Sequence, residues 1–201
     1  MKRACVIIPA RFNSSRFPGK PLVKLNGKEM ILWVAEICAK AVDISNVFIA
    51  TDDNRISDLV SEKGFQSIMT SPNLLTGTDR VAQAAKNLDY EIFVNVQGDE
   101  PLIEPKDILK AIELKIKNPE SVINSFCSIT KNEDPNSINI PKVTITESYD
   151  LIYISRAAIP KSKNNDQGLI YKKQVCIYSY NSKDLAKFLS FGRKSFTEEI
   201  E

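Results

Sequence analysis

The most constraining feature of this chain is the alternation, throughout its first half, of short apolar runs with segments of helical period. Residues 4–8 and 46–51 are apolar on both sides, which is typical of strands buried in a parallel sheet. Residues 29–42 carry apolar side chains at helical spacing, and residues 54–63 repeat that period before Gly64. Strands and helices joined by short connections favour a mainly parallel sheet with helices on both faces.

The rest of the chain extends this pattern and then changes it. We expect strands at 65–70 and 91–97, with helices at 78–88 and 105–117. After Ser121 the expected elements are strands at 121–129, 142–147, 151–155 and 174–180, polar loops at 131–141 and 161–168, and a helix at 182–189. The prediction is an α/β fold with a Rossmann-like twisted sheet in one domain, 1–201, that includes a β-hairpin excursion at 141–160.

The chain contains no histidine among its 201 residues, and its net charge is only +2. The absence of histidine excludes Ser-His and Cys-His nucleophiles and His-ligated zinc. The near balance of charges gives no indication of a nucleic-acid or membrane partner. The chemistry must therefore use carboxylates, lysine, arginine, hydroxyls, backbone amides or a bound metal.

The four cysteines form no CxxC motif, and Cys5 and Cys176 lie in apolar runs. We therefore expect these two to be buried, reduced thiols. The charged start leads into only a short apolar run, which does not resemble a signal peptide. No apolar stretch reaches the length of a membrane span, so we expect a cytoplasmic protein.

A basic loop, PARFNSSRFPGKPL at residues 9–22, follows the first predicted strand. It combines Arg11, Arg16 and Lys20 with small residues, and Gly19 can adopt backbone angles closed to other residues. In parallel α/β sheets the ligand crevice lies beyond the carboxyl ends of the strands. The loop could therefore wrap a triphosphate, although it lacks the Walker spacing. The alternative is a solvated basic surface loop.

A carboxylate-bearing turn, NVQGDEP at residues 95–101, ends the predicted strand at 91–97. Asp99, preceded by Gly98, is well placed to hold Mg²⁺ that bridges nucleotide phosphates. The alternative is a simple turn, because Gly-Asp-Glu-Pro favours turns whatever its function.

Two weaker polar motifs are ATDD at 50–53 and TGTDR at 76–80. The first ends a strand and the second opens a helix, where backbone N–H groups suit a nucleotide. Thr78 or Asp79 could equally be a helix cap.

In this order, IPARFNSSRFPGKPL, ATDD, TGTDR and NVQGDEP resemble the signatures of sugar-activating nucleotidyltransferases. Within that class they are most similar to the CMP-KDO synthetases, the 3-deoxy-manno-octulosonate cytidylyltransferases. ISRAAIP at 154–160 and IYSY at 177–180 are similar to motifs of the second half of that family. The resemblance runs from about residue 4 to the C-terminus, and SSRFPGKPL is its specific part. Acylneuraminate cytidylyltransferases share the fold and reaction but typically differ in this loop.

The resemblance implies a role for each matching position. The catalytic set would be Arg11, Arg16 and Lys20, which neutralise the CTP triphosphate, and Asp99, which holds Mg²⁺. The nucleotide would also contact Pro9, Ala10, Thr51, Asp52, Gly77 and Thr78. The acidic sugar would contact Gln97, Arg156, Gln174 and Tyr178. For Arg156 the alternative is a surface ion pair, and for Tyr178 it is a core aromatic.

The implied reaction is attack of the anomeric hydroxyl of an acidic sugar, KDO in the first place, on the α-phosphate of CTP. The products would be pyrophosphate and a CMP-sugar for lipopolysaccharide or capsule synthesis. Such chemistry needs positioning and charge neutralisation more than a protein nucleophile, so a chain without histidine can perform it. The resemblance also implies a homodimer formed through the hairpin region.

Two departures from the family pattern define the alternatives. Gln174 stands where many members carry a histidine beside the sugar; an amide can hydrogen-bond a hydroxyl but cannot share a proton. Family chains also continue past this point, with a further glutamate near the sugar and a VDTPED-type aspartate that completes the metal site. The alternatives are a catalytically silent or truncated nucleotide-binding paralogue, a nucleotidyltransferase for another acidic sugar, and one that uses another base.

Overall fold

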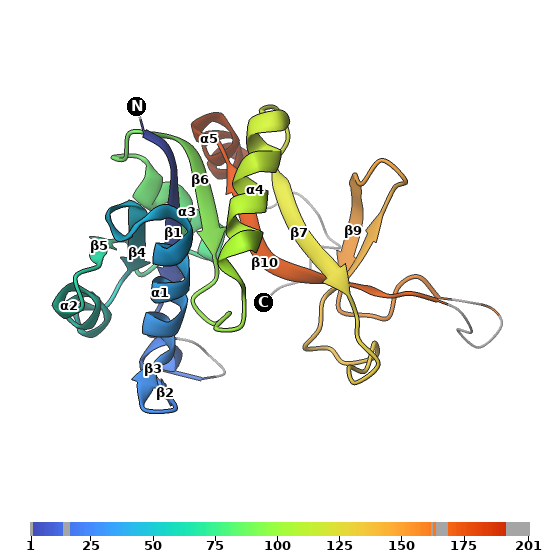
Figure 1. Cartoon of the computed structure of the whole chain (residues 1–201), viewed down its shortest axis with the longest axis horizontal. Coiled ribbons are helices and arrows are strands. Elements are labelled where there is room, and N and C mark those ends of the chain that lie inside the picture. The colour runs from blue at the N-terminus through green and yellow to red at the C-terminus, as the bar shows by residue number, and fades with distance from the viewer. Residues whose placement is uncertain (1, 14–16, 162, 164–168, 192–201) are drawn as a thin grey trace. The chain divides into compact units, whose positions relative to one another are not determined.

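The structure is a computed structural model that describes residues 2–13, 17–161, 163 and 169–191 (Figure 1). The chain forms two compact units. The first comprises Met1–Ile123 and Cys176–Arg193, and the second comprises Asn124–Val175 and Lys194–Glu201.

The first unit is built on a mainly parallel sheet, as the alternating pattern predicts. The strand order is β5 (Gln66–Met69), β4 (Val47–Thr51), β1 (Lys2–Ala10), β6 (Tyr90–Val96) and β10 (Lys172–Tyr180). The neighbours among β5, β4, β1 and β6 pair in parallel, and β10 pairs antiparallel with β6. The sheet therefore has β1 near its centre, with buried neighbours on both sides.

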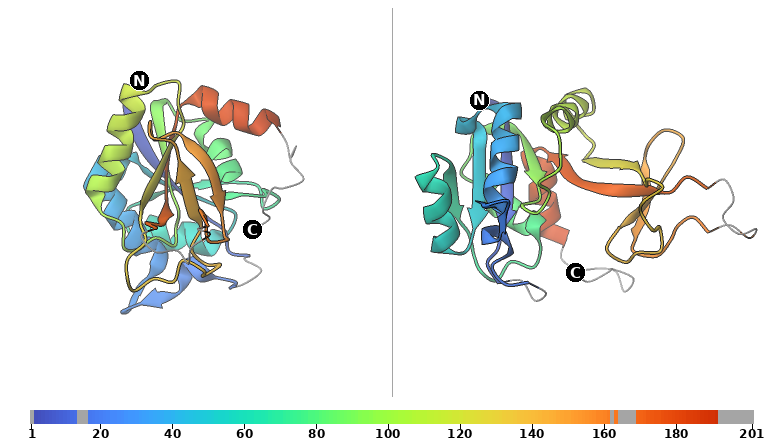
Figure 2. Two further views of the ribbon diagram at one scale, coloured as in Figure 1. Left: turned by 90° about the vertical axis from the view of Figure 1, so that its right-hand side faces the viewer. Right: turned by 60° about the horizontal axis from the view of Figure 1, so that its bottom comes forward.

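Helices cover both faces of this sheet (Figures 1 and 2). On one face α1 (Met30–Val42) packs against α4 (Pro105–Lys117), and on the other α3 (Gly77–Ala85) packs against α5 (Ser182–Phe191). The remaining helix, α2 (Asn54–Glu62), contacts β4 and β5. The predicted Rossmann-like α/β class is confirmed.

Several short elements near the first helix were not predicted from the sequence. After β1, a 3-10 turn covers Lys20–Leu22, and a two-stranded ribbon pairs β2 (Lys24–Leu25) with β3 (Lys28–Glu29). A second 3-10 turn, Ile44–Asn46, follows α1. Elements this short carry no periodic pattern, so sequence periodicity does not detect them.

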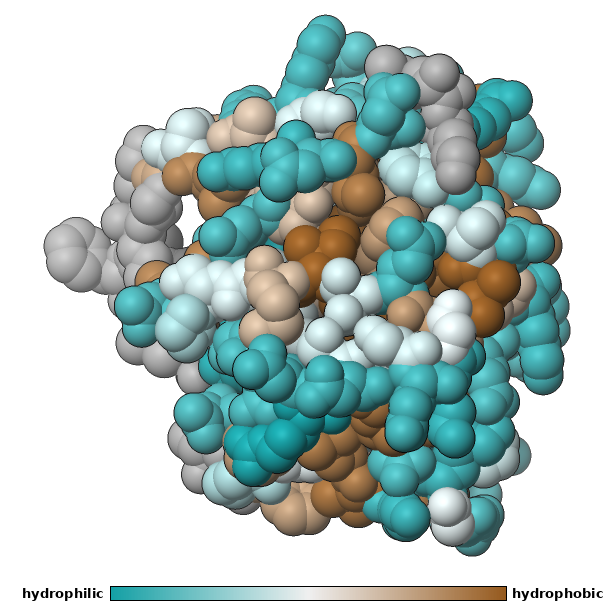
Figure 3. Space-filling view, turned by 90° about the vertical axis from the view of Figure 1, so that its left-hand side faces the viewer, coloured by the Kyte–Doolittle hydropathy of each residue, from teal (hydrophilic) through white to brown (hydrophobic). Residues whose placement is uncertain are grey.

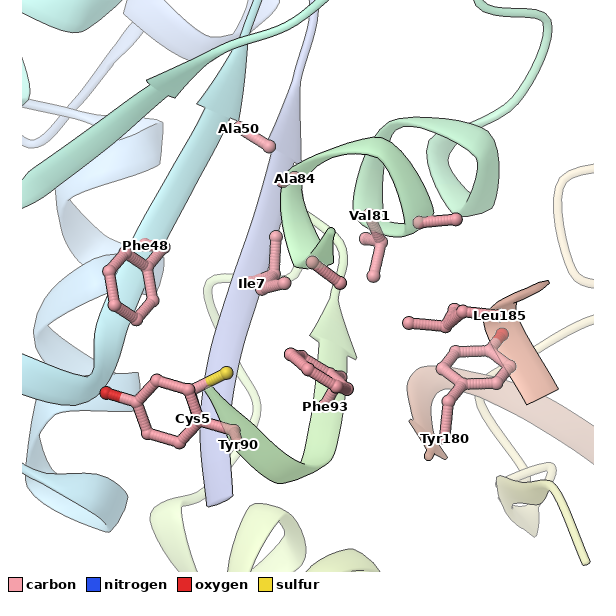
Figure 4. Close-up of a cluster of buried hydrophobic side chains, with 12 residues drawn as sticks. Cys5, Ile7, Phe48, Ala50, Val81, Ala84, Tyr90, Phe93, Tyr180 and Leu185 are labelled. Atoms are coloured by element: carbon pink, nitrogen blue, oxygen red, sulfur yellow. The ribbon is translucent and has the colours of Figure 1, made fainter. Parts of the chain in front are cut away.

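The core explains why β1 is apolar on both sides. Cys5 and Ile7 belong to a cluster with side chains of α3 and α5, shown in Figure 4, in which Phe93 lies edge-on to Tyr90. Ile8 faces the opposite way, toward the α1 side of the sheet near Gly98. Because both faces of β1 are covered by helices, neither set of alternating side chains reaches water.

A buried ion pair joins α4 to α5 in the first unit. The Lys115 side chain is 1% exposed, and its Nζ lies 2.5 Å from the Asp184 carboxylate. The same Nζ donates to the carbonyls of Pro119 and Ser121. Lys115 therefore keeps a full set of acceptors, which a buried cation requires.

The second unit contains β7 (Ile123–Ser128), the hairpin of β8 (Lys142–Ile145) and β9 (Leu151–Ser155), and the first half of β10. The two hairpin strands are antiparallel, as predicted, and Thr146 N–H donates to Asp150 O across the turn. Within this unit Lys173 of β10 forms an ion pair with Glu133. Hydrogen bonding from Lys173 lowers the pKa of Glu133 to about 2.

The side of the molecule that carries α2 and β5 is mostly hydrophilic, with hydrophobic side chains exposed among the polar ones (Figure 3). Exposed apolar residues on these and adjoining segments include Ile44 and Met69. In the described part of the chain, no helix is both long and apolar enough to span a bilayer.

Truncation of Phe93 tests the core of the first unit. Phe93 is 1% exposed, so Phe93→Ala should lower the free energy of unfolding by about 3–5 kcal/mol. Leu102→Ala is the matched control, because Leu102 is 92% exposed and its truncation should change that free energy by less than about 0.5 kcal/mol. Urea unfolding of both variants measures the difference, and equal stabilities would contradict the described core.

Candidate active site

The carboxyl ends of β1, β4 and β6 meet at one edge of the sheet. The registers pair Ala10 of β1 with Thr51 of β4, and Ile7 of β1 with Asn95 of β6. Pro9, Ala10 and Thr51 are buried at this edge. Because a crevice forms beyond the carboxyl ends of parallel strands, the predicted motifs converge where ligands bind in such sheets.

Three of the predicted residues, Gly77, Gln97 and Pro9, lie close together at this edge. A Cβ atom on Gly77 would lie 3.0 Å from Gln97 Nε2 and 3.3 Å from Pro9 Cγ. A Cβ atom on Gly98 would lie 3.2 Å from the Pro9 carbonyl oxygen. Glycine at 77 and 98 therefore lets α3 and the end of β6 close on β1.

The basic loop is closed at its base by Phe12 and Gly19. Gly19 N–H donates to Phe12 O at 2.8 Å, and Gly19 has φ +73°, the left-handed conformation that the sequence prediction anticipated. A Cβ atom on Gly19 would also lie 3.2 Å from the Phe12 ring. This closure brings together the segments that carry Arg11 and Lys20, whereas Arg16 lies outside the described residues.

Lys20 from the basic loop forms an ion pair with Asp99 from the end of β6. Their side chains are 40% and 45% exposed, so both groups remain open to solvent. Lys20 is therefore directed toward the predicted metal ligand, and a cation and a hard oxygen donor stand side by side at the sheet edge.

The oxygen chemistry of this position suits magnesium. Mg²⁺ commonly binds one or two carboxylates and completes its shell with water and substrate phosphate oxygens. Asp99 supplies such a carboxylate, and among the residues that the structure describes no group of three or more Cys, Asp or Glu side chains gathers to form a complete cage. The residues present therefore fit an ion shared with a phosphate ligand.

Asp52 is engaged by the protein itself. One carboxylate oxygen accepts from Arg80 Nη2 at 3.0 Å, and the other accepts from Phe12 N–H at 3.3 Å. The side chains of Asp52 and Arg80 are 9% and 3% exposed. Thr51 is also hydrogen-bonded within the protein. Its hydroxyl accepts from Asp53 N–H, and its carbonyl accepts from the Thr70 hydroxyl. Contact of Thr51 and Asp52 with a nucleotide stays a prediction.

The N-terminus of α3 is capped by Thr76 rather than by Thr78. Thr76 Oγ1 accepts from Asp79 N–H at 3.2 Å, and Asp79 accepts from Thr76 N–H at 2.9 Å, which forms a capping box. The capping interpretation is thus confirmed for Asp79 and wrong for Thr78. The Thr78 hydroxyl instead forms a hydrogen bond with Tyr180. Burial raises the pKa of Tyr180 to about 12, although the bond with Thr78 acts to lower it.

Tyr178 lies across from Asn95, beside the strand end that carries Gln97. Asn95 pairs with Tyr178 in the β6–β10 register and accepts a hydrogen bond from Gln97 Nε2 at 3.3 Å. The Tyr178 ring stacks on Tyr180 with centroids 6.3 Å apart and packs against the hydrophobic cluster. Part of Tyr178 is therefore core, which agrees with the core-aromatic alternative. Contact of Tyr178 and Gln97 with a sugar stays a prediction.

The other two predicted sugar contacts, Arg156 and Gln174, belong to the second unit. Arg156 Nη1 donates to Ile138 O at 2.8 Å, a backbone contact. Gln174 N–H donates to Pro141 O at 3.0 Å. Their role toward a sugar remains a prediction.

Four residues without a role predicted from the sequence organise this edge: Phe12, Arg55, Thr70 and Arg80. Arg55 lies 3.4 Å above the Phe12 ring and pairs with Asp53, whose pKa it lowers. The sequence signal that could have indicated a buried Arg80 is its helical spacing. Arg80 lies four residues before Ala84 on the same helix face, and Ala84 is buried.

The fold and this edge are typical of α/β proteins that bind their ligands at the carboxyl ends of parallel strands. The cytidylyltransferase family model matches residues 5–201, and the chain belongs to that family. This confirms the resemblance drawn from the motifs.

Named relatives are similar over nearly the whole chain. The 8-amino-3,8-dideoxy-manno-octulosonate cytidylyltransferase of Shewanella piezotolerans is 37% identical over 203 residues, which cover 98% of this chain and 82% of that protein. The protein of the same name from Shewanella putrefaciens is 37% identical over 204 residues, with the same two shares covered.

Solved structures support the same assignment. The structure of CMP:2-keto-3-deoxy-manno-octonic acid synthetase complexed with CTP matches with a TM-score of 0.87 and 33% identity, covering 97% of this chain and 80% of that one. A cytidylyltransferase from Leptospira borgpetersenii, at 21% identity, matches with a TM-score of 0.60 over 96% of this chain and 66% of its own, and supports the fold alone.

Thiol reactivity tests the surroundings of Asp99. Cys176 is half-buried, and burial, followed by the carboxylates of Glu100 and Asp99, raises its pKa to about 12. Cys5 and Cys38 are buried, and burial raises the pKa of both thiols, whereas Cys127 is exposed. Because the thiolate is the reactive form, only Cys127 should react rapidly with Ellman's reagent at pH 8.

The control is Cys127→Ser, which should remove the rapid phase and leave the slow thiols unchanged. A rapid phase of one thiol per chain in that variant would contradict the protected environment of Cys176.

Proposed function

We propose that this chain transfers the cytidylyl group of CTP to the anomeric hydroxyl of an acidic eight-carbon sugar of the KDO type, with release of pyrophosphate. The observation that carries the proposal is the Lys20–Asp99 pair, which joins the basic loop after β1 to the carboxylate after β6. Membership of the cytidylyltransferase family supports CTP as the donor.

The basic loop would hold the triphosphate. Arg11 and Lys20 flank the Phe12–Gly19 closure, so both cations project from one constrained piece of backbone. Lysine carries three donors on a compact charge, so Lys20 can bind a phosphate oxygen while it remains beside Asp99. Arg16 would add a third cation, as the family resemblance implies.

Asp99 would hold Mg²⁺ together with phosphate oxygens of CTP. When bound, the ion supplies positive charge that neutralises the triphosphate and its leaving group. The neighbouring Lys20 keeps the carboxylate oriented toward the basic loop.

As the family resemblance implies, Gln97, Arg156, Gln174 and Tyr178 would contact the sugar. A guanidinium suits the carboxylate of an acidic sugar, because it can donate two parallel hydrogen bonds. In-line attack by the sugar hydroxyl then requires alignment and charge neutralisation from these residues, with no protein nucleophile.

Relatives at 37% identity are named for an 8-amino sugar, and a 33% identical structure is named for 2-keto-3-deoxy-manno-octonic acid. These names favour two acceptors that differ only in an amine or a hydroxyl at C8. The Gln174 amide oxygen can accept a hydrogen bond from either group. We therefore propose both sugars as candidate acceptors.

We further propose that the enzyme acts as a homodimer in the cytoplasm, where CTP is made, and supplies a CMP-sugar for lipopolysaccharide or capsule. The hairpin supports dimer formation, because Leu151, Ile152 and Tyr153 follow one another on β9 with exposed fractions of 47%, 64% and 48%. A second copy of the chain would cover this apolar surface.

Pyrophosphate release tests the proposed reaction. The purified chain is supplied with Mg²⁺, either KDO or its 8-amino analogue, and CTP, UTP or ATP. Release with CTP and one of the sugars supports the proposal, and the ratio of kcat/KM for the two sugars identifies the preferred acceptor. Binding of CTP with no release would instead identify a catalytically silent paralogue.

Substitution of Lys20 tests the triphosphate site. Lys20→Ala removes hydrogen bonds to charged oxygens, so the Kd for CTP should rise about 10- to 100-fold by calorimetry. Lys24→Ala is the matched control, because Lys24 is an exposed lysine of the adjoining ribbon that pairs only loosely with Glu29, at 3.5 Å. If both variants bind CTP like the unmodified chain, Lys20 is a surface residue.

A further inference from the structure

Arg80 is a buried cation that reaches from α3 to the ends of two strands. Its side chain is 3% exposed, and its guanidinium donates to Thr70 Oγ1 and to Asp52 Oδ2. Thr70 Oγ1 in turn donates to Thr51 O at 3.0 Å. A buried guanidinium is stable only when its donors are paired, and here its planar fork bridges a hydroxyl and a carboxylate.

Asp52 links Arg80 to the backbone that follows β1. While one of its oxygens accepts from Arg80, the other accepts from Phe12 N–H at 3.3 Å. The chain of contacts Arg80–Asp52–Phe12 thus links α3, the end of β4 and the first turn of the basic loop.

Phe12 is the point at which the basic loop is anchored. Besides its N–H bond to Asp52, its carbonyl accepts from Gly19 N–H, and its ring lies beneath the Arg55 guanidinium. Arg11 precedes Phe12 and Lys20 follows Gly19, so the positions of both cations depend on this residue.

We infer that Arg80 is a positioning residue for the nucleotide triphosphate, because it holds Asp52, and through it Phe12, so that Arg11 and Lys20 are presented in a fixed arrangement. The inference rests on the proposed function. Arg80 is buried, so it acts through Asp52 rather than by touching the nucleotide. Preorganised cations bind a polyanion more tightly, because less conformational freedom is lost on binding.

The diagnostic measurement is the ratio of the Kd values for CMP and CTP. In Arg80→Lys the ammonium keeps the positive charge but cannot bridge Asp52 and Thr70 as a planar fork does. The Kd for CTP should therefore rise about tenfold, while the Kd for CMP, which lacks the β- and γ-phosphates, should stay unchanged. If Arg80 served the fold alone, its substitution would weaken both ligands together.

A second variant covers the case in which Arg80→Lys fails to fold. Arg80→Gln keeps an amide that can donate one hydrogen bond but cannot bridge Asp52 and Thr70, so it should show the same selective loss of CTP binding. Lys115→Met is the matched control: it removes another buried, ion-paired cation of the first unit and should leave the CMP/CTP ratio unchanged.

An unchanged ratio in both Arg80 variants, or an equal loss of CMP and CTP binding, would overturn the inference. Failure of the proposed function is recognised separately, since it would appear as an unmodified chain that binds CTP without releasing pyrophosphate in the presence of sugar.

Discussion

The hydrogen bond from Gly19 N–H to Phe12 O is the contact on which the candidate site depends. It turns the segment after β1 into a closed loop, and the left-handed Gly19 makes that turn possible against the Phe12 ring. Without this closure, no fixed backbone contact would relate Arg11 to Lys20. With it, Lys20 reaches the carboxylate of Asp99 on the neighbouring strand.

In the described part of the first unit two cations, Lys115 and Arg80, are buried, and they have different roles. Lys115 pairs with Asp184 and joins α4 to α5, away from the strand ends that carry the motifs. Arg80 pairs with Asp52, whose second oxygen is bonded to the loop backbone. Burying either charge has a desolvation cost that its partners offset, so neither is strong evidence of stabilisation. Arg80 is connected to the proposed ligand binding because its partner, Asp52, is hydrogen-bonded to the backbone of the basic loop.

Periodicity and proline placement were sufficient to predict most of the fold. The helix expected at 105–117 is observed as Pro105–Lys117, because proline at the first turn and an amphipathic face mark both its start and its extent. The antiparallel pairing of β10 with β6 was not predicted, because strand direction depends on the route of the chain through the second unit. The short turns near residues 20–29 left no pattern long enough to detect.

The candidate site was predictable as a set of motifs, but not as a set of contacts. Strand ends converge by topology, so the motifs that carry Lys20 and Asp99 could be expected at one edge of the sheet although 79 positions separate the two residues. The ion pair of Asp52 with Arg80 could not be predicted in this way. Arg80, 28 positions away, lies on a helix rather than at a strand end, so the convergence of strand ends does not place it. Likewise, Thr76 rather than Thr78 caps α3 because the cap depends on the local backbone conformation, which residue type alone does not determine.

In the proposed function Asp99 serves catalysis, and the loop around Lys20 serves nucleotide binding. Pyrophosphate release by Asp99→Asn, measured with saturating CTP, Mg²⁺ and sugar, tests it most directly. The amide preserves the volume of the side chain but removes the charge that a metal ion requires. We predict that turnover is lost while the melting temperature is retained. Turnover at the rate of the unmodified chain would contradict it.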